Sequence, residues 1–318
     1  MSRHLLLVSS CLLLFNCQFK EKSMTPDDVK IDTLQGTSLL HKPLIRRQIS
    51  PSKDSLQIAK YLIALNDYTR DVMNADHIIW LGRRKAYLGD YKAAISLFSE
   101  GIAKFPNDAR FYRHRGHRYI TTRQLDLAIA DLEQAVQLLQ GTEDIIEPDG
   151  IPNRLNQPVS SLHTNSWYHL GLAYYLKNDL ENALDAFKAC LKASKNDDMV
   201  VATKHWLYMI LRRMQKPDEA EKLVQDIHTD MTIIENDAYH QLLLFYKGEL
   251  TEAELTGTES LGSNEAVYYG VANWYHYNGD EDEARTRYQK LLDTGNWAGF
   301  GYIAAEADLS RMKLKASD

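Results

Sequence analysis

The side chains best suited to recognising a charged ligand are concentrated in residues 113–118, which read Arg-His-Arg-Gly-His-Arg, the densest cationic stretch of the chain. A guanidinium group makes two parallel hydrogen bonds to a carboxylate or a phosphate, and an imidazole titrates near neutral pH. The segment therefore predicts binding of an anion. The alternative is that these arginines pair with carboxylates of neighbouring helices and remain solvated.

Motifs for catalysis are absent from the sequence. It contains no glycine-rich phosphate loop, no H-E-x-x-H, no paired C-x-x-C and no G-x-S-x-G. His114 and His117 share one helix face, and His169 and His205 could approach them, but the flanking arginines disfavour a metal dication. A histidine acting as general acid or base would lack a nucleophile. Cys190 takes a small-residue packing position. We expect a non-enzymatic protein without a metal or cofactor.

The elements that carry these residues form a repeat. From residue 55 onward, apolar residues recur at helical spacing, and the helices come in pairs. A step of 34 residues separates four pairs of small or apolar positions, Gly82 and Gly116, Ala94 and Ala128, Phe98 and Leu132, and Gly101 and Ala135. Four pairs in one register indicate a repeated helix hairpin rather than coincidence.

The clearest unit identifies the kind of repeat. It reads Trp167-x-x-Leu170-Gly171-x-x-Tyr174, followed by Ala183 and Phe187. These residues and offsets resemble the tetratricopeptide-repeat signature. The resemblance extends over residues 72–292 and implies an all-α superhelical solenoid of about six helix hairpins with a capping C-terminal helix. One hairpin cannot bury its apolar face alone, so stacking creates the core.

The repeat register assigns the parts of the chain. We expect an opening helix at residues 53–71, a solenoid at 72–318, and a closing helix at 297–314. The hairpin units are expected near residues 75–108, 109–142, 164–197, 201–232, 234–257 and 265–295. Residues 141–163 interrupt the period with a segment rich in proline, glycine and asparagine, which predicts a loop rather than a helix. This insert is expected either to fold over one end of the groove or to lie passively on the convex side.

The resemblance also predicts a binding surface, because the first helices of such hairpins line a concave groove that contacts ligands. The candidate groove residues are Trp80, Arg83, Tyr87, Arg110, Arg113, His114, His117, Tyr168, His169, Tyr175, His205, Trp206 and Arg212. Arginine and aromatic side chains supply directed hydrogen bonds and flat contact area. The lysine–asparagine clamp of some chaperone-binding members is not reproduced, since Ile79, Arg83, Arg113 and His117 stand at those positions.

The N-terminus predicts an export signal. Residues 5–15 are mostly apolar, too short to span a bilayer, and are followed by Asn16-Cys17 and a polar run. Residues 1–17 resemble a bacterial lipoprotein signal, which implies lipidation at Cys17 and a location in the cell envelope. The alternatives are ordinary secretion and an apolar start that is structural or incidental rather than a signal. Residues 18–52 are expected to be a polar tether, or a strap in which residues 39–45 pack on the body.

Charge and length limit the function classes. The 318 residues include 37 lysines and arginines and 43 aspartates and glutamates, giving a net charge of −6 without a long basic run. A nucleic-acid partner is therefore disfavoured. We expect a scaffold that holds a partner protein or peptide in a basic, aromatic groove. The alternatives are a receptor for a small anion or sugar closed by the 141–163 insert, and a structural subunit that uses the convex face.

Overall fold

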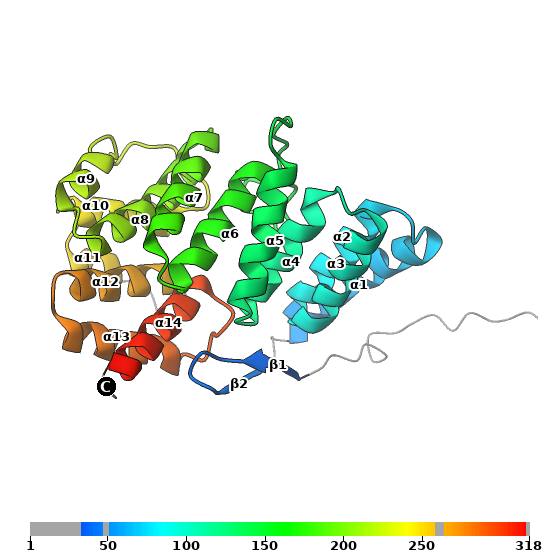
Figure 1. Cartoon of the computed structure of the whole chain (residues 1–318), viewed down its shortest axis with the longest axis horizontal. Coiled ribbons are helices and arrows are strands. Elements are labelled where there is room, and N and C mark those ends of the chain that lie inside the picture. Colours follow the sequence, from blue (N-terminus) through cyan, green and yellow to red (C-terminus); the bar gives the residue numbers. More distant parts are fainter. Residues whose placement is uncertain (1–32, 47–50, 258–263, 316–318) are drawn as a thin grey trace, which may run out of the picture.

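The computed structural model describes residues 33–46, 51–257 and 264–315. Within these ranges the chain forms fourteen helices and one short two-stranded β-hairpin (Figure 1). The helices stack side by side as antiparallel pairs, which confirms the all-α solenoid of tetratricopeptide-type hairpins. The small β-hairpin is the one addition to that fold class in the described ranges.

The helix pairs occur in six hairpins between an opening and a closing helix. The opening helix is α1 (Pro51–Arg70) and the closing helix is α14 (Phe300–Lys315). Between them lie the pairs α2 (Ala75–Tyr87) and α3 (Tyr91–Lys104), α4 (Ala109–Thr121) and α5 (Leu125–Leu138), α6 (Leu162–Leu176) and α7 (Leu180–Ala193), α8 (Asp197–Arg213) and α9 (Pro217–Leu223), α10 (Asp237–Tyr246) and α11 (Glu252–Thr256), and α12 (Glu265–Tyr277) and α13 (Glu281–Asp293).

Close packing within each pair depends on small residues at the crossing point. A Cβ atom on Gly171 of α6 would lie 2.6 Å from the ring of Phe187 on α7, well inside van der Waals contact. Gly82 stands in the same relation to Phe98 in the pair α2–α3. The tight turn of each pair contains one residue of positive φ, namely Gly89, Arg123, Asn178, Gln215, Gly248 and Gly279. The repeat seen in the sequence is thus a repeat of backbone geometry.

The closing helix α14 returns to the inner face of the solenoid. It packs on α12 and α13 and also reaches α6. Its Asp308 pairs with Arg213 of α8 at 2.6 Å, and its Glu306 pairs with Arg123, in the α4–α5 turn, at 2.9 Å. All four side chains are buried. The chain therefore fills much of its own concave face.

An N-terminal strap, residues 33–46, lies against α14 and the α2–α3 hairpin. Strand β1 (Leu34–Thr37) pairs antiparallel with β2 (Pro43–Ile45). The backbone N–H of Leu39 donates to Glu306 at 2.5 Å, and the indole Nε1–H of Trp297 donates to the carbonyl of Ile45 at 2.7 Å. The expected tether is thus wrong for residues 33–46, which pack on the body as a strap. The rest of the tether, apart from the start of α1, lies outside the described residues.

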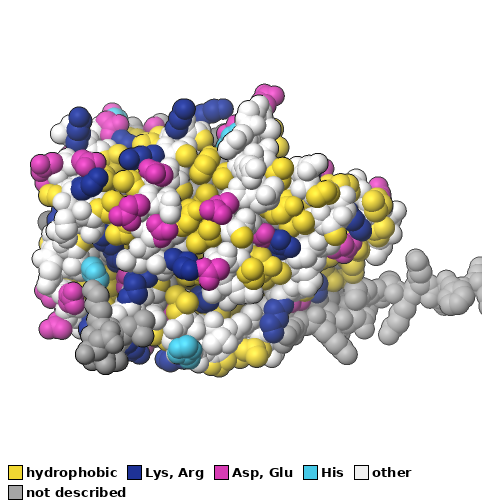
Figure 2. All heavy atoms as spheres, viewed as in Figure 1, with side chains coloured by type: hydrophobic (Ala, Val, Ile, Leu, Met, Phe, Trp, Pro, Cys, Tyr) yellow, Lys and Arg dark blue, Asp and Glu magenta, His cyan; other side chains and the backbone are white. Residues whose placement is uncertain are grey.

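The face of the molecule in Figure 2 mixes charges of both signs. Lysines and arginines are interspersed with aspartates and glutamates over the face in view. Such a face does not create a large field of one sign.

Candidate functional site

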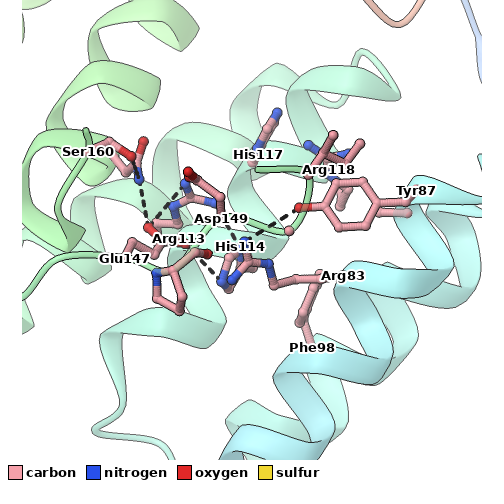
Figure 3. Close-up of a pocket in the computed structure, with 15 residues that line it drawn as sticks. Arg83, Tyr87, Phe98, Arg113, His114, His117, Arg118, Glu147, Asp149 and Ser160 are labelled. Atoms are coloured by element: carbon pink, nitrogen blue, oxygen red, sulfur yellow. Dashed lines mark hydrogen bonds and ion pairs between the residues drawn. The ribbon is translucent and has the colours of Figure 1, made fainter. Parts of the chain in front are cut away.

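A cavity of about 230 Å³ opens between α2, α4 and the insert at residues 141–163. Figure 3 shows the side chains of α2 and α4 converging with Glu147 and Asp149 of the insert. Its lining residues are Arg83, Ala86, Tyr87, Phe98, Arg113, His114, His117, Arg118, Glu147, Pro148, Asp149, Gly150, Ile151, Ser160 and Asn165. The insert therefore folds over one end of the groove, and the convex alternative is wrong.

Glu147 fastens the insert to the repeats. Its carboxylate lies 3.2 Å from the Arg113 guanidinium and 3.3 Å from Nε2 of His114, and it accepts a hydrogen bond of 2.8 Å from the amide of Asn165. Arg113 and Glu147 are 8% and 9% exposed, so water screens this ion pair weakly. The carboxylate thus bridges α4 and α6 from the insert.

Two backbone carbonyls of the insert complete its attachment to α2. Arg83 donates to the carbonyl of Pro148 at 2.7 Å, and Arg84 donates to that of Gly150 at 2.9 Å. Gly150 lies so close to Tyr87 that an added Cβ atom would stand 1.9 Å from the phenol oxygen. Glycine at this position allows the insert to close on α2.

The histidines of the site are neutral, and the positive charge is carried by the arginines. Burial, followed by the charge of Arg113, holds the pKa of His114 well below its ordinary value. Burial and nearby Arg118 have the same effect on the pKa of His117. The Arg113 guanidinium donates to Nδ1 of His114 at 2.9 Å, so the proton of this imidazole is on Nε2, facing Glu147.

Some polar groups of the cavity have no partner of their own. Nε of Arg113, Oε1 of Glu147 and Oδ2 of Asp149 are buried without a hydrogen-bond partner among the described residues. Arg118 pairs with no carboxylate in the described ranges and lies over the ring of Tyr91, 5.4 Å from its centroid. Burial lowers the pKa of Arg118 to about 10, which leaves the guanidinium charged at neutral pH. The cavity therefore holds unmatched charge of both signs.

Five of the thirteen candidate groove residues meet at this cavity: Arg83, Tyr87, Arg113, His114 and His117. Two further candidates lie beside them. Trp80 lies against the Arg83 guanidinium, 4.3 Å from ring centroid to Cζ, and the ring of His169 lies 4.2 Å from that of His117. Arg110 instead pairs with Asp108 and Asp76 at the surface, as the solvated alternative predicted.

Four candidates are wrong as groove residues because they are buried in the core: Tyr168, Tyr175, His205 and Trp206. The indole of Trp206 donates to the hydroxyl of Tyr168 at 2.6 Å. The hydroxyl of Tyr175 lies 2.6 Å from that of Tyr269 on α12. The inward faces of α6 and α8 are covered because α10, α12 and α14 pack over them.

The remaining candidate, Arg212, belongs to a different part of the surface. It donates to the side-chain oxygen of Asn278 at 2.7 Å and lies over the ring of Tyr277, 4.6 Å from its centroid. No single groove therefore connects all the candidates in the described structure.

The sequence interpretation missed the acidic half of the site. Glu147 and Asp149 were in a segment predicted as a loop, without an assigned contact. The available signal was two carboxylates in a turn-rich insert that follows the hairpin containing the most cationic helix of the chain. Lipidation at Cys17 concerns a residue outside the described ranges. No helix in those ranges has the length and apolar character required to span a membrane.

Comparisons with known proteins identify the repeats. Two tetratricopeptide-repeat family models match residues 81–141 and 164–197. The BBSome complex member BBS4 of Bos taurus is 27% identical over 145 residues, which is 46% of this chain and 24% of that protein. This chain thus spans about a quarter of that relative's length.

Two solved structures are similar to this chain at low sequence identity and low TM-score. A tetratricopeptide-repeat protein from Parabacteroides merdae ATCC 43184 has 14% identity and a TM-score of 0.45 over 82% of this chain and 94% of that one. YrrB, described as a TPR protein with an unusual peptide-binding site, has 14% identity and a TM-score of 0.41 over 79% and 97%.

Proposed function

We propose that this tetratricopeptide-repeat protein is a non-enzymatic binding scaffold of the cell envelope, which holds a segment of a partner protein at the cavity between α2, α4 and the insert. The observation that carries the proposal is the unmatched charge of that cavity. Atoms of Arg113, Glu147 and Asp149 are buried there without a hydrogen-bond partner, and Arg118 pairs with no carboxylate of the described residues. Buried polar atoms without partners are rare in folded proteins, and at a surface cavity a ligand supplies what the fold lacks.

Exposed apolar side chains next to the cavity support a protein as the partner. The insert exposes Ile145, Ile146, Ile151 and Leu155, which are between 47% and 62% exposed. Ile151 also lines the cavity. Apolar residues around a polar pocket resemble a protein-binding surface, in which apolar burial supplies affinity and the charged groups supply specificity.

The N-terminal sequence supports the envelope location. The apolar segment before Cys17 has the length of a signal peptide, and lipidation at this cysteine would anchor the chain. Replacement of Cys17 with serine should release the protein from the membrane fraction of a bacterial host. Retention of the Cys17→Ser variant on membranes would remove the anchor from the proposal.

Site-specific photo-crosslinking tests the binding role. A photoreactive amino acid at Ile151, in the full chain and in its native cells, should give a discrete adduct with one partner protein. The same amino acid at the comparably exposed Ile63 of α1 serves as the matched control. Equal patterns at both positions, or none at Ile151, would contradict the proposal.

A receptor for a small ligand is the second candidate, and the size of the cavity favours it. Its volume of about 230 Å³ is smaller than the roughly 300–1,000 Å³ of typical drug-sized pockets. The space accommodates a group about the size of one amino-acid residue. The chemistry of that group follows from the charges on the cavity wall.

A further inference from the structure

The ionised groups of the cavity are three guanidinium groups, on Arg83, Arg113 and Arg118, and two carboxylates, on Glu147 and Asp149. The two histidines of the wall add no charge, because burial and the neighbouring arginines keep them neutral. A cavity for a simple anion would present cations alone. This wall presents both signs.

Three of the five charged groups already have partners. Arg113 and Glu147 form an ion pair, and Arg83 donates to the carbonyl of Pro148 while lying on the face of Trp80. The atoms left over are the Arg118 guanidinium, Nε of Arg113, Oε1 of Glu147 and Oδ2 of Asp149. The unmatched set thus consists of cationic donors and anionic acceptors.

We propose that the cavity binds a ligand with a carboxylate and an ammonium group close together, the carboxylate on Arg118 and Nε of Arg113 and the ammonium on Asp149. This inference rests on the proposed function, since it names the chemistry of the same site. An anion alone would face Glu147 and leave Asp149 unmatched. A cation alone would face three guanidinium groups, and a neutral sugar would match neither charge.

Two hydroxyl groups that line the cavity can donate hydrogen bonds to a ligand. The hydroxyl oxygen of Ser160 accepts a hydrogen bond of 2.9 Å from the amide of Asn165. The phenol oxygen of Tyr87 accepts from Arg83 at 3.5 Å. Because both oxygens act as acceptors in these bonds, each hydroxyl keeps its proton for donation to a ligand that enters the cavity.

Two kinds of ligand present a carboxylate close to an ammonium group. One is a free α-amino acid, and the other is a peptide segment in which an acidic residue and a lysine are neighbours. Calorimetric titration of the purified full chain separates them. One arm uses the twenty common amino acids, and the other uses acetyl-Ala-Asp-Lys-Ala-amide, whose ends carry no charge. Binding in the first arm identifies a free amino acid, and binding in the second alone identifies a peptide segment.

Matched derivatives test the requirement for both charges. For the free amino acid that binds most tightly, we expect its N-acetyl form, which lacks the ammonium, and its amide, which lacks the carboxylate, to bind at least tenfold more weakly. For the peptide, Ala replacement of either charged residue should have the same effect. Equal binding of the carboxylate-only derivative would overturn the proposal in favour of a plain anion site. No binding in either arm would overturn it entirely.

Substitutions test which residue binds the carboxylate of the ligand and which binds its ammonium group. Arg118→Gln and Asp149→Asn should each weaken binding about tenfold, and Asp149→Asn should bind the carboxylate-only derivative at least as well as the parent does. Arg212→Gln, outside the cavity, is the control and should leave affinity unchanged. Circular dichroism verifies that each variant is folded. A crosslink at Ile151 that persists without binding in either arm would overturn this inference and leave the scaffold role intact.

Discussion

Glu147 joins the insert to the repeats through one buried carboxylate. Its replacement by glutamine keeps the shape of the side chain but leaves the Arg113 guanidinium buried without its counter-charge. Breaking a buried ion pair on one side costs roughly 3 kcal/mol. We expect Glu147→Gln to reduce the free energy of unfolding by about that amount, or to release the insert.

Hydrogen exchange distinguishes these two results. A released insert should exchange its backbone amides over residues 145–151 faster, while the amides of α4 and α5 remain protected. The exposed Glu143, four residues earlier in the same insert, provides the control substitution Glu143→Gln. If Glu143→Gln and Glu147→Gln had equal effects, the ion pair would not hold the insert.

The buried histidines make stability depend on pH. Burial lowers the pKa of His205 from 6.5 to about 3. Between these values the unfolded chain binds a proton that the folded chain does not, so stability falls as the pH falls through this window. The slope is about 1.4 kcal/mol per pH unit for one such group.

The corresponding measurement is urea denaturation between pH 7.5 and 5. We expect the unfolding free energy of the parent to decrease as the pH decreases, and His205→Gln to reduce that slope. An unchanged slope in His205→Gln would mean that this imidazole binds protons equally in the folded and the unfolded protein.

At the scale of elements, α14 packs into the concave face of the solenoid and covers part of it. Asp308 accepts hydrogen bonds from Arg213 and Tyr269, and nearby arginines, with Arg213 foremost, hold its pKa well below the ordinary range against the effect of burial. Asp308→Asn should therefore cost roughly 3 kcal/mol, by leaving Arg213 buried with no full counter-charge. Chemical denaturation measures this loss.

The matched control for this substitution is Asp282→Asn, at an exposed carboxylate in the first turn of α13. Its effect on unfolding should be within about 0.5 kcal/mol. A loss equally small for Asp308→Asn would show that the amide replaces the carboxylate in these contacts. The ion pair would then contribute little to the docking of α14.

The sequence predicts the hairpins because their determinants are local. A small residue where two helices cross, such as Gly171 opposite Phe187, recurs at a fixed offset and needs no knowledge of distant segments. The residues that remain exposed in the groove could not be predicted from local sequence in this way. Which inward residues remain accessible depends on α14 and the insert, and neither has a repeat signature. Tyr175 and Trp206 were therefore assigned to the right helix faces but not to the core.

The whole molecule departs from an open solenoid in its long-range contacts. In an open solenoid each repeat contacts its neighbours, so stability is nearly a sum of local terms. Here Arg123 and Glu306 are 183 residues apart in sequence and form a buried pair. The strap at residues 33–46 also contacts Glu306, and it contacts Trp297 before α14. These links join the first repeats directly to the last helix.

These long-range contacts between the first repeats and the last helix should make unfolding cooperative across the chain. We expect one urea transition, with the same midpoint by circular dichroism and by tryptophan fluorescence, because Trp80, Trp206 and Trp297 report on different repeats. Removal of residues 300–318 takes away the carboxylates that pair with Arg123 and Arg213 and the helix that covers them. The two probes should then separate and the radius of gyration should increase. A chain shortened only after Lys315 retains all the described contacts and should behave as the parent. Coincident transitions in the longer deletion would mean that neighbour contacts alone make the solenoid cooperative.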